Sequence, residues 1–378
     1  MIKLLIGGSP CTFWSIAQKN NRETVPKGQG WELFKNYLIA KEKFQPNYFL
    51  YENNKSMANP IKECISDNFG YEPYLINSAL VSAQRRERYY WTNIPNISQP
   101  KDRGILLKDI LELGENLTNG TESINFENKK ESNCKRIINK TKGTDSKSCT
   151  LTASCYKGAG SDGMPVVAQP VRVGHMNKGS QGDGIYAIDG KSICLSANGG
   201  GRGAKTGLYA TPLEFINGMP TKAVSSIDGK EYVIYKVADR KITINGVIYP
   251  IKLEDGYYII RKLTVTECCR LQTMPDDYCR AVSATQGYKG LGNGWTAEVI
   301  IHILRHANIP LDEEILVLSM YDGIGTGRYC LDKMGYKNIK YYAYEIDKYA
   351  IQIAMSNYPD IVQCGDAFQV KNKDWKIE

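Results

Sequence analysis

Residues 315–327 read Ile-Leu-Val-Leu-Ser-Met-Tyr-Asp-Gly-Ile-Gly-Thr-Gly, and this stretch decides the fold. Its first part is a short apolar run, which is typical of a buried strand. Three glycines follow at alternate positions, and helical spacing continues from there to Gly335, a residue type that commonly ends a helix. A strand that passes through a glycine turn into a helix lets a ligand approach bare backbone beside a helix N-terminus. We therefore predict an α/β unit with a ligand-binding turn.

Acidic residues follow the next two strands in this part of the chain. Lys340–Glu345 is a predicted strand, and Glu345 lies 20 residues beyond Gly325, where a carboxylate can bind ribose hydroxyls. Asp366 follows another short apolar run. These positions indicate a nucleoside-containing cofactor, either a nicotinamide dinucleotide or S-adenosylmethionine. The Gly-x-Gly-x-Gly spacing differs from the dinucleotide fingerprint, which weakens the nicotinamide interpretation. For the glycines alone, a plain tight turn is an equal alternative.

The N-terminal part of the chain alternates strand and helix patterns up to about residue 110. Short apolar runs predict the strands, and apolar residues at helical spacing predict the helices between them. Such alternation is typical of a doubly wound parallel sheet. The predicted strands are Ile2–Ile6, Tyr48–Tyr51, Glu72–Asn77 and Tyr89–Thr92, and the predicted helices are Trp31–Lys43 and Pro60–Asn68.

The middle of the chain has a different composition. Residues 143–207 hold 14 of the 35 glycines, so we predict loops and short strands there. A weak repeat relates residues 147–153 to residues 191–197, which indicates either two equivalent loops facing one partner or two similar hairpins without a function. Helical signals return with a capping box at Thr264 and Glu267. The changes predict a core split by an insert, with parts 1–113, 114–260 and 261–378.

Charge and cysteine content set the class of protein. The chain has 48 Lys and Arg against 40 Asp and Glu, and the net charge of +8 is compatible with a polyanionic partner. With 11 cysteines, 3 histidines and no paired metal-ligand spacing, we expect neither a disulfide framework nor a zinc site. No apolar run approaches the roughly 18 residues of a membrane span, and the first residues do not resemble a signal peptide. We expect a cytoplasmic protein that binds neither a metal nor a membrane.

A cysteine and a carboxylate follow neighbouring strands of the predicted sheet. Pro10-Cys11 comes directly after the first strand, and Glu52 comes at the end of the second. Because ligands bind at the carboxyl ends of strands in open α/β sheets, we expect both side chains in one cleft. A thiolate there can act as a nucleophile, and a half-buried carboxylate can hold a proton. A structural thiol and a helix-capping glutamate are the plainer alternatives.

An arginine-rich run opens the aromatic strand at residues 89–91. It reads Gln84-Arg85-Arg86-Glu87-Arg88, and alternation puts Arg86 and Arg88 on one face of the strand and Arg85 on the other. Such a run is usually a solvated face. Because this one enters the predicted catalytic sheet, a phosphate or base contact is the competing interpretation.

As a set, these motifs resemble those of the DNA (cytosine-5) methyltransferases. Ser9-Pro10-Cys11, Glu52-Asn53-Asn54 and the arginine-rich run look like the nucleophile, glutamate and arginine motifs, in family order. The resemblance implies a Rossmann-like S-adenosylmethionine-dependent methyltransferase core, with a smaller, glycine-rich, mainly β target-recognition domain inserted. Later motifs of the family are matched by Arg261–Asp276, Gly292–Trp295, Tyr321–Gly327, Glu345 and Gly365-Asp366.

The order of the motifs departs from the pattern of most family members. Their cofactor motifs come first, whereas here these motifs come last, so the sequence resembles a circular permutation. The spatial order of a sheet does not depend on where the chain is cut, so the chemistry is not in doubt. The permutation predicts that residues 1 and 378 lie near each other.

The resemblance implies a covalent mechanism for methylation of cytosine at carbon 5. Cys11 would add to carbon 6 of a cytosine that has been flipped out of the duplex. Glu52 would hold the amino edge and protonate ring nitrogen 3. Arg88 would bind the 2-oxygen, and Arg86 would help position Cys11 and the DNA phosphates. Residues 12–29 would form a loop that closes over the flipped nucleotide.

The implied cofactor is S-adenosylmethionine, with Glu345 on its ribose and Asp366 on its adenine. Glycines would admit the methionine end, and Asn293 and Trp295 would close the pocket. The full set of implied cofactor contacts is Pro10, Leu33, Asn293, Trp295, Tyr321, Asp322, Gly323, Gly325, Gly327, Glu345, Ile346, Asp366 and Ala367. Candidate DNA contacts are Ser15, Gln18, Arg172, Lys178, Arg202 and Lys205.

Double-stranded DNA is the substrate that the resemblance implies, since the long insert offers surface for reading a groove. It also implies a monomer of bacterial or phage origin that acts in restriction–modification or DNA protection, with a cognate restriction endonuclease as a candidate partner. The alternatives are a transfer RNA cytosine-5 methyltransferase and a catalytically silent DNA-binding homologue. A nicotinamide oxidoreductase would leave the cysteine and arginine motifs unexplained.

Overall fold

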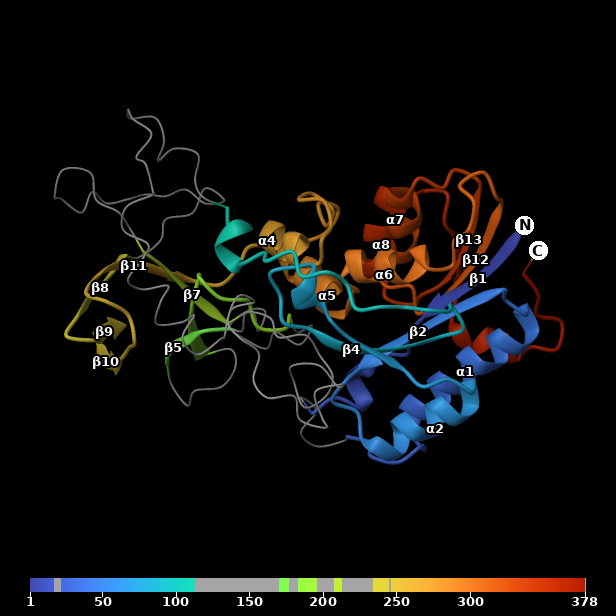
Figure 1. Cartoon of the computed structure of the whole chain (residues 1–378), viewed down its shortest axis with the longest axis horizontal. Helices are drawn as coiled ribbons and strands as arrows, with labels where there is room; N and C mark the ends of the chain where they lie inside the picture. The colour runs from blue at the N-terminus through green and yellow to red at the C-terminus, as the bar shows by residue number, and fades with distance from the viewer. Residues whose placement is uncertain are drawn as a thin grey trace, which may run out of the picture. The chain divides into compact units, whose positions relative to one another are not determined.

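The computed structural model describes residues 1–16, 22–112, 170–176, 183–195, 207–212, 234–244 and 246–377. All of them belong to one compact unit, which comprises Met1–Glu112, Val167–Met219 and Val233–Glu378. This unit contains two seven-stranded sheets (Figure 1). In the described ranges, no helix has the length and apolar character needed to cross a bilayer.

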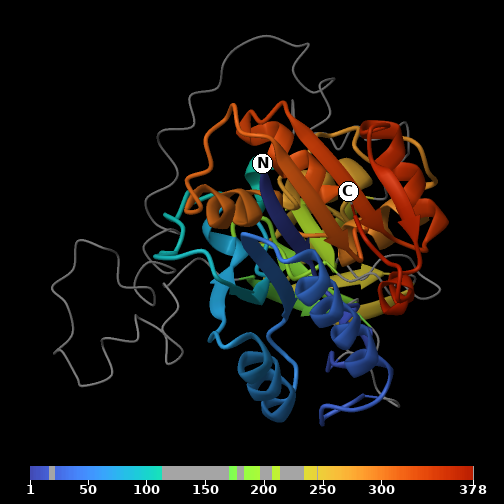
Figure 2. The ribbon, with the colours of Figure 1, turned by 90° about the vertical axis from the view of Figure 1, so that its right-hand side faces the viewer.

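The first sheet is built from both ends of the chain. Its strand order is β14-β13-β12-β1-β2-β4-β3, so strands from the C-terminal part lie directly beside the first strand (Figure 2). β1 pairs in parallel with β12, from Ile2 opposite Ile315 to Gly7 opposite Met320. The strands are β1 (Ile2–Gly7), β2 (Tyr48–Asn54), β3 (Tyr74–Asn77), β4 (Glu87–Thr92), β12 (Ile315–Met320), β13 (Ile339–Tyr344) and β14 (Val362–Gly365).

One edge of this sheet differs from the prediction of a wholly parallel sheet. β14, β13, β12, β1 and β2 run parallel, but β4 is antiparallel to both β2 and β3. The physical reason is the length of the connection. Only residues 78–86 join β3 to β4, and a parallel crossover needs a dozen or more residues.

Helices cover both faces of the first sheet, and alternate strand residues separate two hydrophobic clusters. In β1, Leu4 and Ile6 belong to one cluster and Leu5 belongs to the other, as the two-residue period of a strand requires. The cluster that contains Leu5 is covered by α1 (Gln29–Phe44), α2 (Asn59–Phe69) and η8 (Ala367–Lys371). The other is covered by α4 (Val265–Leu271), α5 (Ala284–Asn293), α6 (Ala297–Arg305), α7 (Thr326–Met334) and α8 (Lys348–Asn357).

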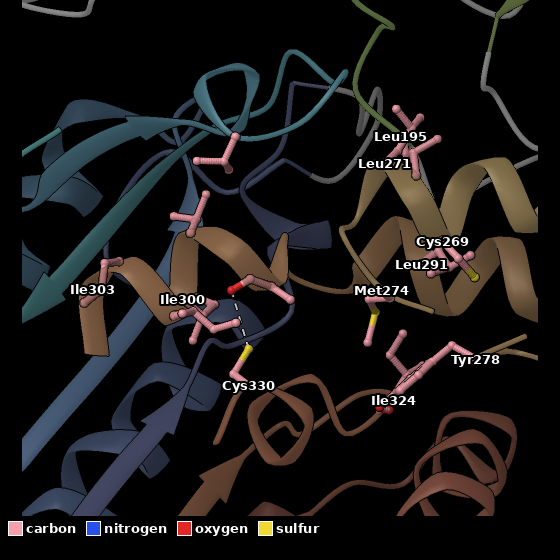
Figure 3. Packing of buried hydrophobic residues seen from close by; sticks show 14 of the residues in the cluster. Leu195, Cys269, Leu271, Met274, Tyr278, Leu291, Ile300, Ile303, Ile324 and Cys330 are labelled. Atoms are coloured by element: carbon pink, nitrogen blue, oxygen red, sulfur yellow. Dashed lines mark hydrogen bonds between the residues drawn. The ribbon is translucent and has the colours of Figure 1, made fainter. Parts of the chain in front are cut away.

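The larger cluster joins these five helices to the inserted region. Figure 3 shows Cys330 of α7, whose thiol donates to the backbone carbonyl of Ala297 at 3.5 Å. Leu195 belongs to the same buried cluster as Leu271, at the end of α4 (Figure 3). The core of the first sheet therefore includes side chains from the predicted insert.

The described part of the insert forms the second sheet. Its strand order is β10-β9-β8-β11-β7-β6-β5, with every neighbouring pair antiparallel except β6 and β7. A third, smaller hydrophobic cluster lies within this sheet. The strands are β5 (Arg172–His175), β6 (Gly184–Ala187), β7 (Leu208–Pro212), β8 (Ile234–Ala238), β9 (Lys241–Ile244), β10 (Val247–Pro250) and β11 (Gly256–Arg261).

The C-terminal segment folds back beside the N-terminal strand. Lys43 in α1 donates to the backbone carbonyls of Val370 and Asn372 at 2.8 and 2.7 Å. Ile377 packs against the cluster that contains Leu5, a residue of the first strand. The predicted neighbour of residue 1, residue 378, lies outside the described residues.

A buried carboxylate fixes the point where the second sheet returns to the core. Glu267 accepts two hydrogen bonds from the Arg261 guanidinium, at 2.6 and 2.7 Å, and both side chains are buried. It also accepts the backbone N–H groups of Thr264 and Glu112 at 2.8 and 2.9 Å. The predicted capping box of Thr264 and Glu267 is confirmed at the start of α4. One side chain thereby holds the ends of the segments that lead into and out of the insert.

We expect Glu267→Ala to lower the free energy of unfolding by about 3–5 kcal/mol, because it leaves the Arg261 charge buried without a partner. The matched control is Asp276→Ala, which removes a half-exposed partner of Arg270 and should cost about 1 kcal/mol or less. Urea unfolding of both variants measures the difference. Equal losses in the two variants would contradict the role given to Glu267.

Candidate active site

The carboxyl ends of four neighbouring strands bring the predicted chemistry together. Cys11 follows β1, Glu52 lies in β2, the glycine turn follows β12, and Glu345 follows β13. Since these strands are parallel, their carboxyl ends meet at one edge. They line a single pocket. Eleven predicted residues contribute to its lining, namely Pro10, Cys11, Glu52, Arg86, Arg88, Asn293, Trp295, Tyr321, Asp322, Gly323 and Glu345.

The other predicted cofactor residues lie around this pocket rather than in its lining. The Leu33 carbonyl accepts the Tyr321 hydroxyl at 2.7 Å. Asp366 caps η8 by accepting the Phe368 N–H at 2.9 Å, and Ala367, the first residue of that helix, is buried. Ile346 is 74% exposed. Gly325 and Gly327 pack inside the fold, where a Cβ on Gly327 would lie 2.3 Å from Ile6.

Asparagines of β2 hold the turn that carries Cys11. The Asn53 amide donates to the Ser9 carbonyl at 3.1 Å, and the Asn54 amide donates to the Cys11 carbonyl at 3.4 Å. Gly8 must be glycine, because a Cβ there would lie 2.4 Å from the Glu52 carbonyl oxygen. Only Glu52 was expected to have a role in this motif. The two asparagines give the same motif a second task, which is to fix the position of Cys11.

Glu52 and Arg88 form an ion pair beside Cys11. Arg88 Nε lies 3.1 Å from Glu52 Oε1, and both side chains are almost buried. The second oxygen, Oε2, accepts the Trp295 indole N–H at 3.0 Å. Burial alone would lower the pKa of Arg88, but electrostatic attraction to the neighbouring side chains, Cys194 and Glu52 first among them, outweighs burial and raises this pKa. Arg88 is therefore a permanent cation at the centre of the pocket.

Arg86 is buried at 3% exposure and binds two distant segments. Its guanidinium donates to the carbonyls of Gly292 and Gly294 at 3.2 and 2.8 Å. It also donates to the Leu195 carbonyl and the Cys194 sulfur, both at 3.4 Å. We expected Arg86 to help position Cys11 and DNA phosphates, whereas these contacts anchor the insert and the loop before α6. Arg85, which alternation placed on the other face, is half exposed and precedes β4.

Backbone N–H groups fix the Glu345 carboxylate beside the glycine turn of the pocket. Its Oε2 accepts the Gly323 N–H at 2.8 Å, and its Oε1 accepts the N–H groups of Ile346 and Asp347, also at 2.8 Å. Gly323 has a φ of +64°, which suits glycine. The carboxylate and the glycine turn are thus one hydrogen-bonded unit.

The pocket contains polar atoms that lack partners among the described residues. Oδ2 of Asp322, Oγ1 of Thr326 and Oε1 of Gln286 are all buried in this way, and all three residues line the pocket. Buried polar atoms normally have hydrogen-bond partners. The three atoms therefore point to a polar ligand. Sequence reasoning missed Gln286, because helix α5 had not been predicted.

Burial, together with the nearby Glu345 carboxylate, raises the pKa of Asp322 to about 6. Hydrogen bonds from Tyr341 and Ser319 to Oδ1, at 2.6 and 2.7 Å, act in the opposite direction. Asp322 therefore loses its proton near pH 6, a pH at which the stability of the protein can be measured.

The predicted closing loop is described only at its two ends. Residues 17–21 lie outside the described residues, and Gln18 with them. On the near side, Trp14 is fully buried and donates to Glu23 Oε2 at 3.0 Å. On the far side, Arg22 donates to the Ser56 carbonyl at 2.6 Å. Both ends of the loop are thus tied to the core.

A second hollow, of about 690 Å³, shares Arg88 with the pocket. Lys55 and Arg85 lie in its wall, and both pair with the Glu87 carboxylate. Lys55 Nζ lies 3.0 Å from Oε2, and Arg85 Nη2 lies 3.1 Å from Oε1. The remaining lining is Asn54, Ser56, Pro170, Tyr186, Ile193 and Cys194. Of the candidate DNA contacts, Ser15 and Arg172 are described, and neither lines the hollow. Gln18, Lys178, Arg202 and Lys205 lie outside the described residues.

Known proteins resemble this chain over most of its length. A family model described as C-5 cytosine-specific DNA methylase matches residues 1–308. The type II methyltransferase M.HhaI of Haemophilus parahaemolyticus is 25% identical over 321 residues, which cover 80% of this chain and 73% of that protein. The type II methyltransferase M.HgiBI of Herpetosiphon aurantiacus is 36% identical over 101 residues, which cover 24% and 22%. A solved structure of a Spodoptera frugiperda DNMT2 mutant matches with a TM-score of 0.40, at 14% identity, over 81% and 79% of the two chains.

The pKa of Asp322 predicts how stability depends on pH. Between about pH 4 and pH 6 the unfolded chain loses this proton before the folded chain does, so folding stability falls as the pH rises through that window. Asp322→Asn keeps the oxygen that accepts from Tyr341 and removes the charge. We expect the variant to be more stable than the wild type by about 2–3 kcal/mol at pH 7.5 and equally stable near pH 4.

Urea unfolding at four pH values between 4 and 7.5 measures this difference. Asp67→Asn, on the exposed side of α2, is the control and should follow the wild type. A difference between Asp322→Asn and the wild type that stays constant with pH would refute the buried ionisation.

Proposed function

The chain belongs to the C-5 cytosine-specific DNA methylase family, and from this membership we propose that it methylates carbon 5 of a specific cytosine in duplex DNA through Cys11. The observation that carries the proposal is that Cys11, the Glu52–Arg88 ion pair and the glycine turn line one pocket. A nucleophile and a methyl donor must reach the same base, and a shared pocket meets that requirement. We further propose a role in restriction–modification or in the protection of phage or host DNA.

The pocket residues fit S-adenosylmethionine as the cofactor, which supplies an electrophilic methyl group when bound. Glu345 would hold the ribose, and Asp366 at the cap of η8 would hold the adenine amino group. Ile346, exposed beside Glu345, offers an apolar surface to the adenine ring. The unpartnered atoms of Asp322, Thr326 and Gln286 support the fit, because the methionine end carries an ammonium and a carboxylate.

The mechanism assigns one task to each of three side chains. The Cys11 thiolate forms a bond to carbon 6 of the cytosine, and the electron pair of the 5,6 double bond makes carbon 5 nucleophilic. Glu52 delivers a proton to ring nitrogen 3 and so neutralises the charge that would otherwise develop on the ring. Arg88 donates to the 2-oxygen. Once carbon 5 carries the methyl group, loss of its proton restores the double bond and expels Cys11.

A stacked cytosine cannot present carbon 6 to Cys11, so the target base must leave the duplex. We propose that the DNA strand beside the flipped base lies along the 690 Å³ hollow. Lys55 and Arg85 in the wall of the hollow carry the positive charge that phosphates require. Since the hollow and the pocket share Arg88, a strand in the hollow would deliver its base to Cys11.

We also propose that the chain is a circular permutation of the common family order. The family match ends at residue 308, before the glycine turn at residues 321–327. The direct pairing of β12 with β1 supports the proposal, because cofactor-binding and nucleophile strands are neighbours although they lie at opposite ends of the chain. A location in the cytoplasm suits the free thiols of the described cysteines.

Methyl transfer is the direct test of the proposed function. We expect the protein to transfer labelled methyl groups from S-adenosylmethionine to unmethylated bacterial genomic DNA, and Cys11→Ser to lower the rate by at least about 1,000-fold, because a hydroxyl is a far weaker nucleophile at neutral pH. Cys64→Ser, in α2, is the matched control and should keep full activity. Label in transfer RNA alone would reject DNA as the substrate, and label in neither nucleic acid would reject the enzyme.

The covalent step has its own test, with DNA that contains 5-fluorocytosine. Fluorine cannot leave carbon 5 as a proton does, so the Cys11 adduct should persist and survive denaturing electrophoresis as a protein–DNA band. The band should require both S-adenosylmethionine and Cys11. A band of equal intensity with Cys11→Ser would rule out this cysteine as the nucleophile.

Cofactor binding is tested separately by Glu345→Gln. The amide cannot accept all three backbone N–H groups that the carboxylate accepts and carries no charge for the ribose hydroxyls. We expect calorimetric titration to give a Kd for S-adenosylmethionine that is about 10–100-fold higher. Glu63→Gln, exposed on α2, should leave this Kd unchanged. An unaltered Kd in Glu345→Gln would place the ribose elsewhere.

A further inference from the structure

Cys194 lies against the catalytic arginine although it belongs to the inserted region. Arg88 Nη2 donates to its sulfur at 3.6 Å, and Arg86 Nη1 donates to it at 3.4 Å. The sulfur is partly buried and lines the 690 Å³ hollow. The proposed mechanism and the proposed cofactor contacts do not involve this thiol.

The segment that carries Cys194 is hydrogen-bonded to core residues 82–85, which lie just before strand β4. Ser192 donates its N–H to the Ala83 carbonyl at 2.7 Å and accepts the Arg85 N–H at 3.0 Å. The buried Lys191 ammonium donates to the Ser82 carbonyl at 2.9 Å. The position of the sulfur is therefore set by the core, and the sulfur can in turn set the position of the arginines.

A closed ring of contacts runs through this sulfur. Cys194 contacts Arg88, which pairs with Glu52, which accepts the Trp295 indole N–H. The carbonyl of Gly294, next to Trp295, accepts from Arg86, and Arg86 donates to Cys194 again. Moving the sulfur would thus disturb the catalytic ion pair from two directions.

We propose that Cys194 is a positioning residue for methyl transfer, which holds Arg88 in the orientation that the target base requires. The inference rests on the proposed function and deepens it. Arg88 uses Nε for Glu52, one Nη1 N–H for the Glu87 carbonyl at 2.8 Å and one Nη2 N–H for Cys194. These three contacts fix the plane of the guanidinium. Its remaining N–H groups therefore point in a fixed direction and can donate only to a base that lies there.

The chemistry of the thiol suits this position. Burial would raise the pKa of Cys194, but Arg86 and Arg88 outweigh burial and lower it. The thiol therefore gains anionic character below its ordinary range and becomes a stronger acceptor for both guanidinium groups. The charged or titratable groups around it are Arg86 and Arg88 on the core side, Glu52 and Cys11 beyond Arg88, and Lys55, Arg85, Glu87 and Tyr186 in the hollow.

Two substitutions separate positioning from simple packing. Cys194→Ala removes the acceptor, and Cys194→Ser keeps a neutral acceptor that does not ionise at working pH. We expect kcat to fall about tenfold in the alanine variant and to be largely recovered in the serine variant. The KM for S-adenosylmethionine should stay within twofold of the wild type in both, since Cys194 does not line the cofactor end. Cys64→Ser is the matched control.

A loss of packing alone would not change the pH dependence of kcat, so the pH profile of kcat separates positioning from packing. Both variants lack one ionisable group beside Arg88, so their profiles should shift from that of the wild type, whereas that of Cys64→Ser should superimpose on it. Superimposable profiles for Cys194→Ser and the wild type would overturn the inference, even if Cys194→Ala fails to fold. A loss of kcat matched by an equal loss of cofactor affinity would overturn it too. If the wild type itself methylates no DNA, it is the proposed function that fails.

Discussion

A buried guanidinium is the strictest constraint in this molecule, because it loses water and must recover every hydrogen bond from the protein. Arg86 meets this need with acceptors from two segments more than 100 residues away, Cys194–Leu195 and Gly292–Gly294. The insert and the loop before α6 are thereby fixed to the strand that carries Arg88. Trp295 follows Gly294 directly and holds Glu52. The orientation of the Glu52 carboxylate thus depends on an arginine that does not contact it.

The parallel part of the sheet explains how distant motifs come to one pocket. Strands that run the same way end at the same edge, whatever their order along the chain. β12 is near the C-terminal end and β1 is the first strand, yet Met320 lies opposite Gly7 in register. The chemistry depends on this adjacency and not on a peptide connection between the two strands. A rearranged motif order is therefore compatible with an unchanged site.

Much of the fold and of the pocket could be predicted because end-of-strand positions can be read from apolar runs. Cys11, Glu52 and Glu345 follow such runs, and all three line the pocket. The direction of β4 could not be predicted, because an apolar run looks the same in a parallel and an antiparallel strand. Only the short connection after β3 decides the direction. Gln286 was missed because helix α5 was not predicted, and Cys194 was missed for a different reason. The importance of Cys194 lies in its contacts with Arg86 and Arg88, more than 100 residues away, and one sequence alone carries no signal for such contacts. The roles of Asn53 and Asn54 were missed likewise, because their partners are backbone carbonyls.

The charge balance of the pocket gives a reason for a thiol at position 194. Arg88 carries a permanent charge and pairs with Glu52, the carboxylate to which the proposed mechanism gives the proton transfer. A second carboxylate in the place of Cys194 would compete for Arg88 and leave Glu52 with a weaker partner. A neutral apolar residue would leave Arg86 and Arg88, two neighbouring cations, with one acceptor fewer between them. A thiol with a lowered pKa lies between these extremes, because it is negatively charged only to the extent that the two arginines stabilise the thiolate. It can therefore screen the two cations from each other without displacing Glu52 from Arg88.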